Sequence, residues 1–576
     1  MTSRNPSAAD LKAIFGTDRK PDAETTHRLG SFEVTMANGQ ITAIHRAGQE
    51  IARGLTYLLR DKDWATCPAD SDMPHAAGKI DVQGRIDASG IAFSYSLTVE
   101  PDGHDALTVR SIGVAKSDFL ANRIGLTILH PVPDTVGVPL EIRHLGGGHT
   151  QCQFPRHIQP SQPAFDIAAL SYPLPDGATL QITFEATNPD GTPVCFEMED
   201  QRNWGDASYK TYIGSLLDPW PFAVKAGAVF KQSIRIAVSP ASKVRSKTRT
   251  TVHKPRPFRL PELGASIPLG QGPEALLNIT HHGAPPAAFV SAYLRSDRID
   301  PDDLQAIKDV AELLSCPLRL ELEIHGKPKE TVPQVARKIR GCGLNVAQIL
   351  ACPAPYLKSY QPGGDWPDVE PLEVFYARVR DGFPTAAIGG GMLTYFTEIN
   401  RKWPPTDTID FIGHAYCPII HASDDKTILQ NAATLPLMAD TIAAHARGLP
   451  YDLISASLSM RSNPYGAVPV PNPEGRRMAM AQADPREGGA FAGLWMLAIA
   501  EKLGQTHARS FCVGALAGPA SIYDACAKDG RRPSFDAFAA LANLAGADRQ
   551  TFDAEVARLR TTTYAQAWAA LRHLHV

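Results

Sequence analysis

The second half of this chain alternates between strand-like and helix-like segments, and this alternation limits the fold more than any other feature. Eight short apolar runs there have the composition of buried strands. They lie at residues 261–267, 288–294, 317–324, 345–351, 385–389, 409–415, 452–459 and 508–514. Helical segments separate several of these runs. Eight strands that alternate with helices predict a (β/α)8 barrel, the TIM-like fold.

Helix signals in this half support the same fold. Asp300 followed by Pro301 is a typical helix start, because the aspartate accepts a backbone N–H and proline fits the first turn. A buried stripe at helical spacing follows it, formed by Leu304, Ile307, Val310 and Leu314. Further helices are predicted at residues 332–342, 371–381, 425–447 and 486–503. We therefore place the barrel at residues 261–525 and a C-terminal helical segment at residues 526–576.

The first part of the chain, residues 1–240, has the pattern of β-structure. Apolar residues alternate with other residues at 93–99, 124–128, 180–184 and 234–238, the period-2 signature of half-buried strands. Turn sequences such as Asn38-Gly39 separate the strands. Many short strands without a convincing helix between them predict an N-terminal antiparallel β-sandwich.

Residues 241–260 differ from both parts. This segment is basic, contains proline and has no apolar period, so we interpret it as a linker. Over all 576 residues the net charge is −3, and charged residues make up 20%. This balance gives no reason to expect binding to nucleic acid or to an anionic membrane.

Cysteine usage and the N-terminus bear on the cellular compartment. The chain has nine cysteines, and no two stand at a C-x-x-C spacing. An odd number without such pairs indicates reduced thiols and not a disulfide framework. The first residues lack the apolar core of a secretory signal, and the apolar stretch near residues 490–500 is too short to span a bilayer. We therefore expect a cytoplasmic protein, and the sequence leaves its oligomeric state open.

In a (β/α)8 barrel the functional side chains come from the C-terminal ends of the strands. The polar residues that follow the predicted strands, or end them, are therefore the candidates for an active site. They are Arg295 with Asp297, Glu321 with Glu323, Glu398 with Asn400, His414 with His421, and Arg461 with Asn463.

Glu398 and Asn400 form the sharpest pair among them. A carboxylate and an amide two positions apart, just past a strand, are suited to hold a water and a substrate hydroxyl, as a general base requires. An ion pair between Glu398 and a neighbouring arginine at the barrel rim is an equally good interpretation.

The arginines and histidines also have two interpretations each. Arg295 and Arg461 are suited to bind a carboxylate or to stabilise a developing oxyanion. The alternative is a structural ion pair with Asp297 or Glu323. His421 is suited to acid–base chemistry, although a single histidine is more often a structural residue.

One loop in the β-rich part has an unusual composition. Residues 196–212 combine carboxylates, an amide, a tryptophan and tyrosines, the mixture that a sugar-binding surface needs for hydroxyls and for a sugar face. The candidates for substrate binding there are Glu199, Asp200, Asn203, Trp204 and Lys210. The alternative is a solvated hairpin that the tryptophan anchors to the core.

Motifs for metals and cofactors are weak. His144 and His149 flank a run of glycines without an adjacent carboxylate, which is more typical of a flexible turn than of a metal site. The run Gly389–Gly391 lacks the third spaced glycine of a dinucleotide-binding loop. The motifs of serine hydrolases and of zinc proteases do not occur. We expect no metal and no cofactor.

The motifs together resemble those of the D-apionate lactonase family. The most specific part is the run Glu-Asp-Gln-Arg-Asn-Trp at residues 199–204. Further matches are Asn122-Arg-Ile-Gly with Leu129-His-Pro131, Phe154-Pro155 with Gln159-Pro160 and Gln162-Pro163, Phe396-Thr-Glu-Ile-Asn-Arg401, and Arg461-Ser-Asn-Pro464. The resemblance covers roughly residues 30–520. It implies a glycosidase-like barrel with an attached β-sandwich, and a hydrolase that opens D-apionolactone to D-apionate in bacterial apiose breakdown.

Opening a lactone requires an attacking water, a base and a group that stabilises the oxyanion. On this interpretation Glu398 is the base, and Arg461 and His421 are further catalytic residues. The small sugar-acid lactone would be bound by Arg295, Asn400, Asn463 and the loop residues Glu199, Asp200, Asn203, Trp204 and Lys210.

Two alternatives remain open. A glycoside hydrolase needs a second carboxylate beside the scissile bond, but the late strand near Phe511 offers none, so Glu323 or Asp297 would have to serve. A carbohydrate-binding homologue without activity would fit this missing carboxylate. Replacing Glu398 by glutamine separates the cases, because catalysis would collapse in the two enzymes while only binding would change in the third.

Overall fold

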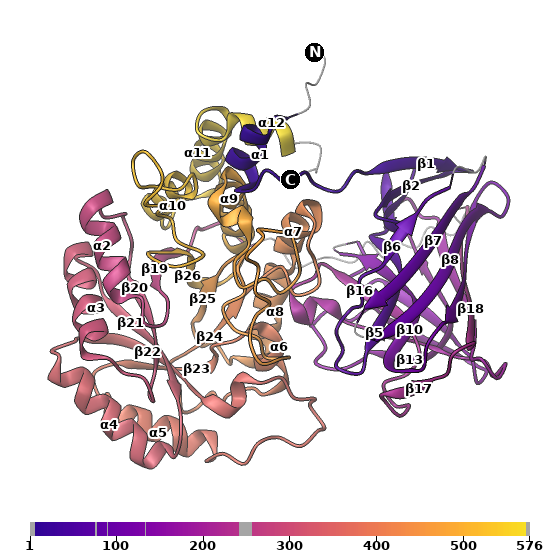
Figure 1. The fold of residues 1–576 in the computed structure, drawn as a ribbon. Coiled ribbons are helices and arrows are strands. Elements are labelled where there is room, and N and C mark those ends of the chain that lie inside the picture. The colour runs from indigo at the N-terminus through magenta and orange to yellow at the C-terminus, as the bar shows by residue number, and fades with distance from the viewer. Residues whose placement is uncertain (1–5, 75–77, 89, 133, 241–255, 572–576) are drawn as a thin grey trace. The chain divides into compact units, whose positions relative to one another are not determined.

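The computed structural model describes residues 6–74, 78–88, 90–132, 134–240 and 256–571. The chain divides into two compact units (Figure 1). The barrel unit comprises Met1–Pro21, Arg202–Asp206 and His253–Val576, and the β unit comprises Asp22–Gln201 and Ala207–Val252. Of the predicted linker at residues 241–260, residues 241–255 lie outside the described residues.

Eight parallel strands close into a barrel in the barrel unit. They are β19 (Glu262–Ile267), β20 (Val290–Arg295), β21 (Leu318–Ile324), β22 (Val346–Pro353), β23 (Ala387–Met392), β24 (Phe411–Tyr416), β25 (Tyr451–Ala456) and β26 (Ala508–Ala515). Each strand pairs in parallel with its sequence neighbour, and β19 closes the ring against β26. The predicted barrel is confirmed, since each predicted strand overlaps an observed one.

Helices lie between the barrel strands and on their outer side (Figure 1). They are α2 (Gly272–His282), α3 (Pro301–Leu314), α4 (Pro328–Gly341), α5 (Leu372–Gly382), α6 (Phe396–Arg401), α7 (Asp425–Asn431), α8 (Leu435–His445) and α9 (Ala490–Leu503), with short 3-10 helices at Ala354–Leu357, Ala432–Thr434 and Pro485–Gly488. As predicted, Asp300 caps α3, and its side chain accepts the backbone N–H of Asp302. The single helix predicted at residues 425–447 is wrong in detail, because α7 ends before a 3-10 turn and α8 begins with Pro436 in its first turn.

The C-terminal tail, for which a helical segment was predicted, forms three helices. They are α10 (Ser534–Asn543), α11 (Arg549–Thr561) and α12 (Ala565–Leu571). The sequence did not predict helix α1 (Ala8–Phe15), which belongs to the barrel unit and packs against α9 through the rings of Phe15 and Phe491, 6.1 Å apart. None of the described helices combines the length and the apolar character that a membrane crossing requires.

Charged side chains fill the N-terminal end of the barrel. Arg319 lies 3.7 Å from Asp452 and donates a hydrogen bond to Ser510 Oγ at 2.7 Å. Arg509 forms a two-fold hydrogen bond with the same aspartate. These pairs hold strands β21, β25 and β26 together at the end of the barrel opposite to the candidate active site.

The β unit consists of antiparallel strands. They are β1 (Thr25–Leu29), β2 (Phe32–Ala37), β3 (Gln40–Arg46), β4 (Gln49–Ala52), β5 (Gly54–Asp61), β6 (Asp70–Asp72), β7 (Ile80–Ala88), β8 (Ile91–Pro101), β9 (Ala106–Ala115), β10 (Phe119–Pro131), β11 (Pro139–His144), β12 (His149–Gln153), β13 (Ala164–Pro173), β14 (Thr179–Thr187), β15 (Phe196–Glu199), β16 (Ser208–Ile213), β17 (Phe222–Val224) and β18 (Val229–Ser239). Their pairings join them into one continuous sheet. Strand β8 shows the predicted alternation, with every second residue buried. The predicted fold class, a barrel preceded by an antiparallel β domain, is confirmed.

The two histidines that flank the glycine run, His144 and His149, lie in this unit. Nε2 of His144 contacts the hydroxyl of Thr150 at 2.8 Å, and Nδ1 of His149 contacts Glu141 at 3.0 Å. Among the residues that the structure describes, no group of three or more His, Cys, Asp or Glu side chains is arranged to hold a metal ion.

Candidate active site

Glu398 lies in the first turn of α6, directly after strand β23, and only 1% of its surface is exposed. Its Oε2 accepts the backbone N–H of Tyr395 at 3.0 Å, which fixes the carboxylate at the start of the helix. Its Oε1 is buried and makes no hydrogen bond of good geometry within the described chain, although the hydroxyls of Ser359 and Thr394 lie close to the carboxylate. Burial raises the pKa of Glu398, and the charge of Arg401, the Tyr395 N–H and these two hydroxyls offset part of this rise. A buried carboxylate with one fixed and one available oxygen is suited to accept a proton.

Arg461 reaches the barrel mouth from the loop that follows β25. Its guanidinium forms an ion pair with Glu321 at 2.6 Å and donates to the backbone carbonyl of Leu393. The same group lies over the ring of Tyr293, 4.9 Å from the ring centre. Burial alone would lower the pKa of Arg461, but Glu321 and Tyr293 raise it, so the side chain stays charged. Arg461 therefore joins side chains of β20 and β21 to the backbone after β23.

Glu323 stands two residues after Glu321 at the end of β21 and binds two neighbours. Its Oε2 accepts the hydroxyl hydrogen of Tyr293 at 2.5 Å, and its Oε1 contacts Nε2 of His325. Both carboxylate oxygens are therefore engaged, and the residue is 5% exposed. The side chain of His325 is 28% exposed.

Arg295, predicted to bind substrate, belongs to the same cluster. It holds Asp297 with two hydrogen bonds of 3.1 and 3.0 Å, and its Nε lies 3.9 Å from Glu323. Burial raises the pKa of the Asp297 carboxyl, but the hydrogen bonds from Arg295 and the nearby His325 outweigh it, so the net effect lowers the pKa. The structural ion pair considered for Arg295 is thus present.

Cys352 links the Glu323 cluster to Glu398. It is the last residue but one of β22 and stands directly beside Glu323 in the strand register, and its Sγ lies 3.8 Å from the sulfur of Met392 on β23. Burial raises the pKa of the Cys352 thiol, and the charges of Glu323 and Glu398 add to the rise. The charges of both carboxylates thus act on one buried thiol at the barrel mouth.

A second group of predicted residues gathers around α6. The amide nitrogen of Asn400 donates to Oδ1 of Asn203 at 3.0 Å, and the hydroxyl of Thr397 donates to the Asn203 carbonyl at 2.8 Å. The guanidinium of Arg401 lies 5.2 Å from the ring centre of Trp204. The segment Arg202–Asp206, distant in sequence, is thus a structural part of the barrel unit.

His421 lies at the far side of the same segment. Its Nδ1 contacts Oδ2 of Asp206 at 2.6 Å, and its ring centre lies 6.0 Å from that of Trp204. Asp206 also contacts the amide of Asn431 at 3.4 Å. The predicted catalytic histidine therefore contacts the segment around Trp204, and no contact joins it to Glu398, Arg461 or Glu323 in the described structure.

Asn463 shapes its own loop. Its Oδ1 accepts the backbone N–H groups of Tyr465 and Gly466, both at 2.9 Å, and its amide donates to the carbonyl of Val468. The loop places the hydroxyl of Tyr465 3.4 Å from that of Thr397, beside Glu398 in the sequence. Asn463 thus fixes the loop that lies over the start of α6.

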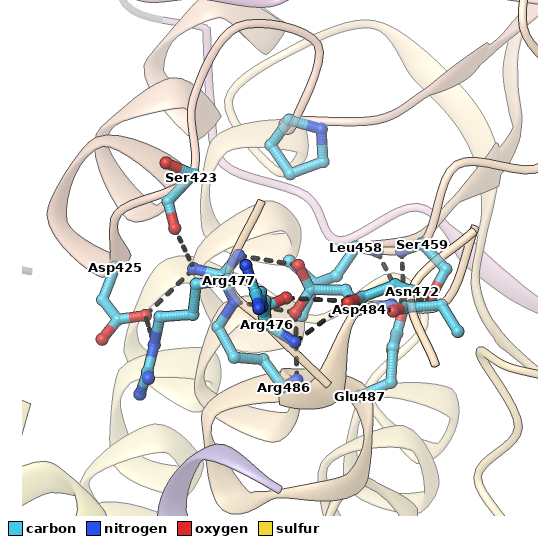
Figure 2. A network of polar contacts seen from close by, with 12 residues as sticks. Ser423, Asp425, Leu458, Ser459, Asn472, Arg476, Arg477, Asp484, Arg486 and Glu487 are labelled. Carbon is cyan, nitrogen blue, oxygen red and sulfur yellow. Dashed lines mark hydrogen bonds and ion pairs between the residues drawn. The ribbon is translucent and has the colours of Figure 1, made fainter. Parts of the chain in front are cut away.

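A buried polar network secures the two ends of the long loop that carries Arg461 and Tyr465 (Figure 2). Arg486 is fully buried and forms a two-fold pair with Asp484, with distances of 2.8 and 2.7 Å. It also donates to the Ser423 carbonyl and to Asp425. The Glu487 carboxylate accepts the backbone N–H groups of the two residues after Ser457, at 2.8 and 3.0 Å.

The remaining predicted binding residues belong to the β unit. Lys210 forms an ion pair with Glu199 across strands β15 and β16. Burial lowers the pKa of Lys210, and the charge of Glu199 offsets part of this effect. Asp200 accepts the backbone N–H of Gln159 at 3.0 Å. All three side chains therefore have bonds within the β unit itself.

Sequence reasoning missed two residues of the barrel mouth, His325 and Tyr293. The alternation that singled out Glu321 and Glu323 would have reached His325 if it had been continued by two residues past the last apolar position. Tyr293 stands two residues before Arg295 on β20, so the same period would have found it.

Comparisons with known proteins agree with the motifs. Residues 12–241 match the family described as "D-apionate lactonase, N-terminal domain", and residues 283–546 match "D-apionate lactonase, TIM barrel domain". A D-apionate lactonase from Brucella anthropi is 32% identical over 574 residues, covering 94% of this chain and 91% of that protein.

Solved structures offer only distant similarities. A family 30 glycoside hydrolase endoxylanase from Clostridium papyrosolvens gives a TM-score of 0.31 at 9% identity, covering 50% of this chain and 73% of that one. A family 30 xylanase from Clostridium acetobutylicum gives 0.30 at 9% identity, covering 51% and 74%. Values this low carry no argument about function. The sequence matches, in contrast, span both units, and the chain belongs to the D-apionate lactonase family.

Proposed function

We propose that this protein hydrolyses a sugar-acid lactone, opening D-apionolactone to D-apionate, and that it serves apiose breakdown in the cytoplasm. The observation that carries the proposal is Glu398, a buried carboxylate at the mouth of the barrel with one oxygen fixed and the other available. Family membership supplies the substrate class. The chemistry follows from the residues around Glu398.

In this proposal Glu398 is the general base. It takes a proton from a water molecule while the water oxygen attacks the lactone carbonyl carbon. The raised pKa of Glu398 makes its carboxylate a stronger base than an exposed glutamate. Activity should therefore fall as the pH is lowered through this raised pKa, because the protonated carboxyl cannot accept the proton.

Arg461 is the proposed stabiliser of the oxyanion. It carries a full charge, and 20% of its side chain is exposed although Glu321 holds one face of the guanidinium. A cation fixed in this way stabilises negative charge without having to reorganise during the reaction. Arg295 is the second cation at the mouth, and we propose it as a substrate ligand.

The other predicted residues fall into two groups. Asn400, Asn203 and Trp204 lie together beside α6, within reach of a sugar ring bound there. His421, Asn463, Glu199, Asp200 and Lys210 stay predictions for catalysis or substrate binding. Glu398 is 1% exposed, and the hydroxyl of Tyr465 lies 3.4 Å from that of the neighbouring Thr397.

The test is proton release by the purified protein on D-apionolactone, with other sugar lactones and a panel of aryl glycosides in parallel. Wild-type protein should acidify the D-apionolactone solution well above the spontaneous rate. The variant E398Q should lose on the order of 10²- to 10⁴-fold in kcat, the range for a general base, and should unfold like wild type. The matched control E373Q changes an exposed glutamate in the first turn of α5 and should keep full activity.

Release of an aglycone from a glycoside, with silence on every lactone, would mean that the barrel is a glycosidase. Of the two carboxylates that could serve as the second one, Glu323 has both oxygens engaged by Tyr293 and His325, and Asp297 has both oxygens engaged by Arg295. An E398Q protein with full lactonase activity would refute the assignment of the base.

A further inference from the structure

The general-base scheme leaves one step without a residue. When the tetrahedral intermediate collapses, the bond from carbonyl carbon to ring oxygen breaks, and the ring oxygen leaves as an alkoxide. An alkoxide is a poor leaving group, so a group that donates a proton to it accelerates the step. His325 stands at the same end of the barrel and has no role in the scheme so far.

The backbone of His325 is held at both of its polar groups. Its N–H donates to the hydroxyl of Ser296 at 2.7 Å, and its carbonyl accepts the hydroxyl of Thr331 at 2.9 Å. The residue follows the last position of β21, so a strand of the barrel fixes its start. These bonds fix the backbone from which the imidazole projects, and a catalytic group requires such a fixed position.

The ring is oriented through one nitrogen. Nε2 contacts Oε1 of Glu323, whose other oxygen is held by Tyr293, and Asp297 lies 3.8 Å from the same nitrogen. Two carboxylates thus face Nε2 of the ring. A carboxylate at one ring nitrogen fixes the tautomer and leaves the other nitrogen for proton transfer.

The other nitrogen is available. No residue of the described chain forms a hydrogen bond with Nδ1 of His325, and 28% of the side chain is exposed. In the cluster of Tyr293, Glu323 and His325, the tyrosine hydroxyl and both carboxylate oxygens are hydrogen-bonded. Only the histidine has a ring nitrogen without a partner and a side chain that solvent can reach. Cys352 stands beside Glu323 in the strand register, and the charges of Glu323 and Glu398 both raise the pKa of its thiol.

We propose that His325 is the general acid of the lactone hydrolysis proposed above. Water attacks the carbonyl carbon and gives its proton to Glu398. The bond between that carbon and the ring oxygen then breaks, the oxygen keeps the electron pair, and it takes the proton from Nδ1 of His325. The product is a hydroxy acid, and both residues return to their starting states by exchanging one proton each with solvent.

The experiment compares two lactones of the same sugar acid, one with oxygen and one with sulfur in the ring. A thiolate leaves without protonation, since a thiol has a pKa of about 8.5, far below that of an alcohol. H325N should therefore lose about 100-fold or more in kcat on the oxygen lactone and less than about tenfold on the sulfur lactone. E323Q, which keeps the ring but removes the orienting charge, should show the same selective loss to a smaller extent.

The control is H281N, which changes an exposed histidine in the last turn of α2 and should leave both rates unchanged. Equal losses of H325N on both lactones, or no loss on either, would overturn the role of His325 while the lactonase function stands. A wild-type protein that opens neither lactone would refute the proposed function, and the role of His325 with it. The sulfur lactone also serves as the folding check, because a misfolded variant would lose both activities.

Discussion

Arg486 offers the sharpest test of what holds the active-site loop in place. Its guanidinium is fully buried between Asp484 and Asp425, and the Asp484 side chain is equally buried (Figure 2). Burial alone would lower the pKa of Arg486, but the two carboxylates raise it, so the pair is ionised. The change R486M removes the charge with little change in volume and leaves Asp484 as a buried carboxylate without a counterion.

The expected loss follows from this geometry. Removing one partner of a buried ion pair costs about 3–5 kcal/mol, mainly because the other charge stays buried. Asp425 keeps the ion pair with Arg477 at 3.0 Å, so only Asp484 loses its counterion entirely. We therefore expect the free energy of unfolding of R486M to be about 3 kcal/mol below that of wild type, at the lower end of that range. The double variant D484N/R486M should recover part of the loss, because it removes the stranded charge.

The assay is urea unfolding followed by the helical far-ultraviolet circular dichroism signal. All described α-helices belong to the barrel unit, so this signal reports on that unit. The matched control is R476M, whose arginine is 61% exposed and pairs with Glu474 at the surface. Exposed pairs contribute about 0–1 kcal/mol, so the control should be nearly neutral. A loss in R486M below about 1 kcal/mol, or equal to that of R476M, would refute the reasoning.

Two further perturbations test other parts of the fold. Burial raises the pKa of Glu487 from 4.5 to about 7, so its contribution to stability is fully present below pH 4.5 and is lost as the pH rises through 7. This pKa interval corresponds to roughly 3 kcal/mol, so the free energy of unfolding of E487Q should rise by that amount relative to wild type between about pH 4.5 and pH 8. A difference between the two proteins that does not change with pH would contradict the linkage. Gly391 has φ +133°, and a Cβ there would lie 2.0 Å from the carbonyl oxygen of Gly413 on the next strand. G391A should therefore cost about 2–4 kcal/mol in a thermal melt, whereas G341A at the end of α4, where the space is open, should be neutral or slightly stabilising.

The barrel could be predicted because its signals are local. Each apolar run is one strand, and its neighbours in the barrel are also its neighbours in the sequence, so no long-range information is needed to order the strands. The error at residues 425–447 came from reading apolar spacing alone. Pro436 fits the first turn of a helix and cannot continue the one before it, so the segment becomes two helices.

The active site could be predicted only in part. Glu398, Arg461 and Arg295 were named as candidates from their positions after strands, since strand ends are visible in the sequence, and their roles stay predictions. The pair of Arg295 with Asp297 was among the alternatives because the two residues are close in sequence. The partner of Arg461 was not predicted, because its ion pair with Glu321 joins positions 140 residues apart and has no local pattern. His325 carries no motif, and its contact with Glu323 depends on the strand continuing beyond its apolar core.

The segment Arg202–Asp206 determines whether the two units can be produced, or passed on in evolution, separately. The chain leaves the barrel unit after Pro21, returns to it for these five residues, leaves again and enters it finally at His253. A barrel expressed from the linker onward would therefore lack Asn203, the partner of Asn400, and Asp206, the partner of His421. Because the segments of the two units alternate along the sequence, neither unit can be transferred to another protein as one continuous piece. We therefore expect both units to be retained together wherever the activity is retained.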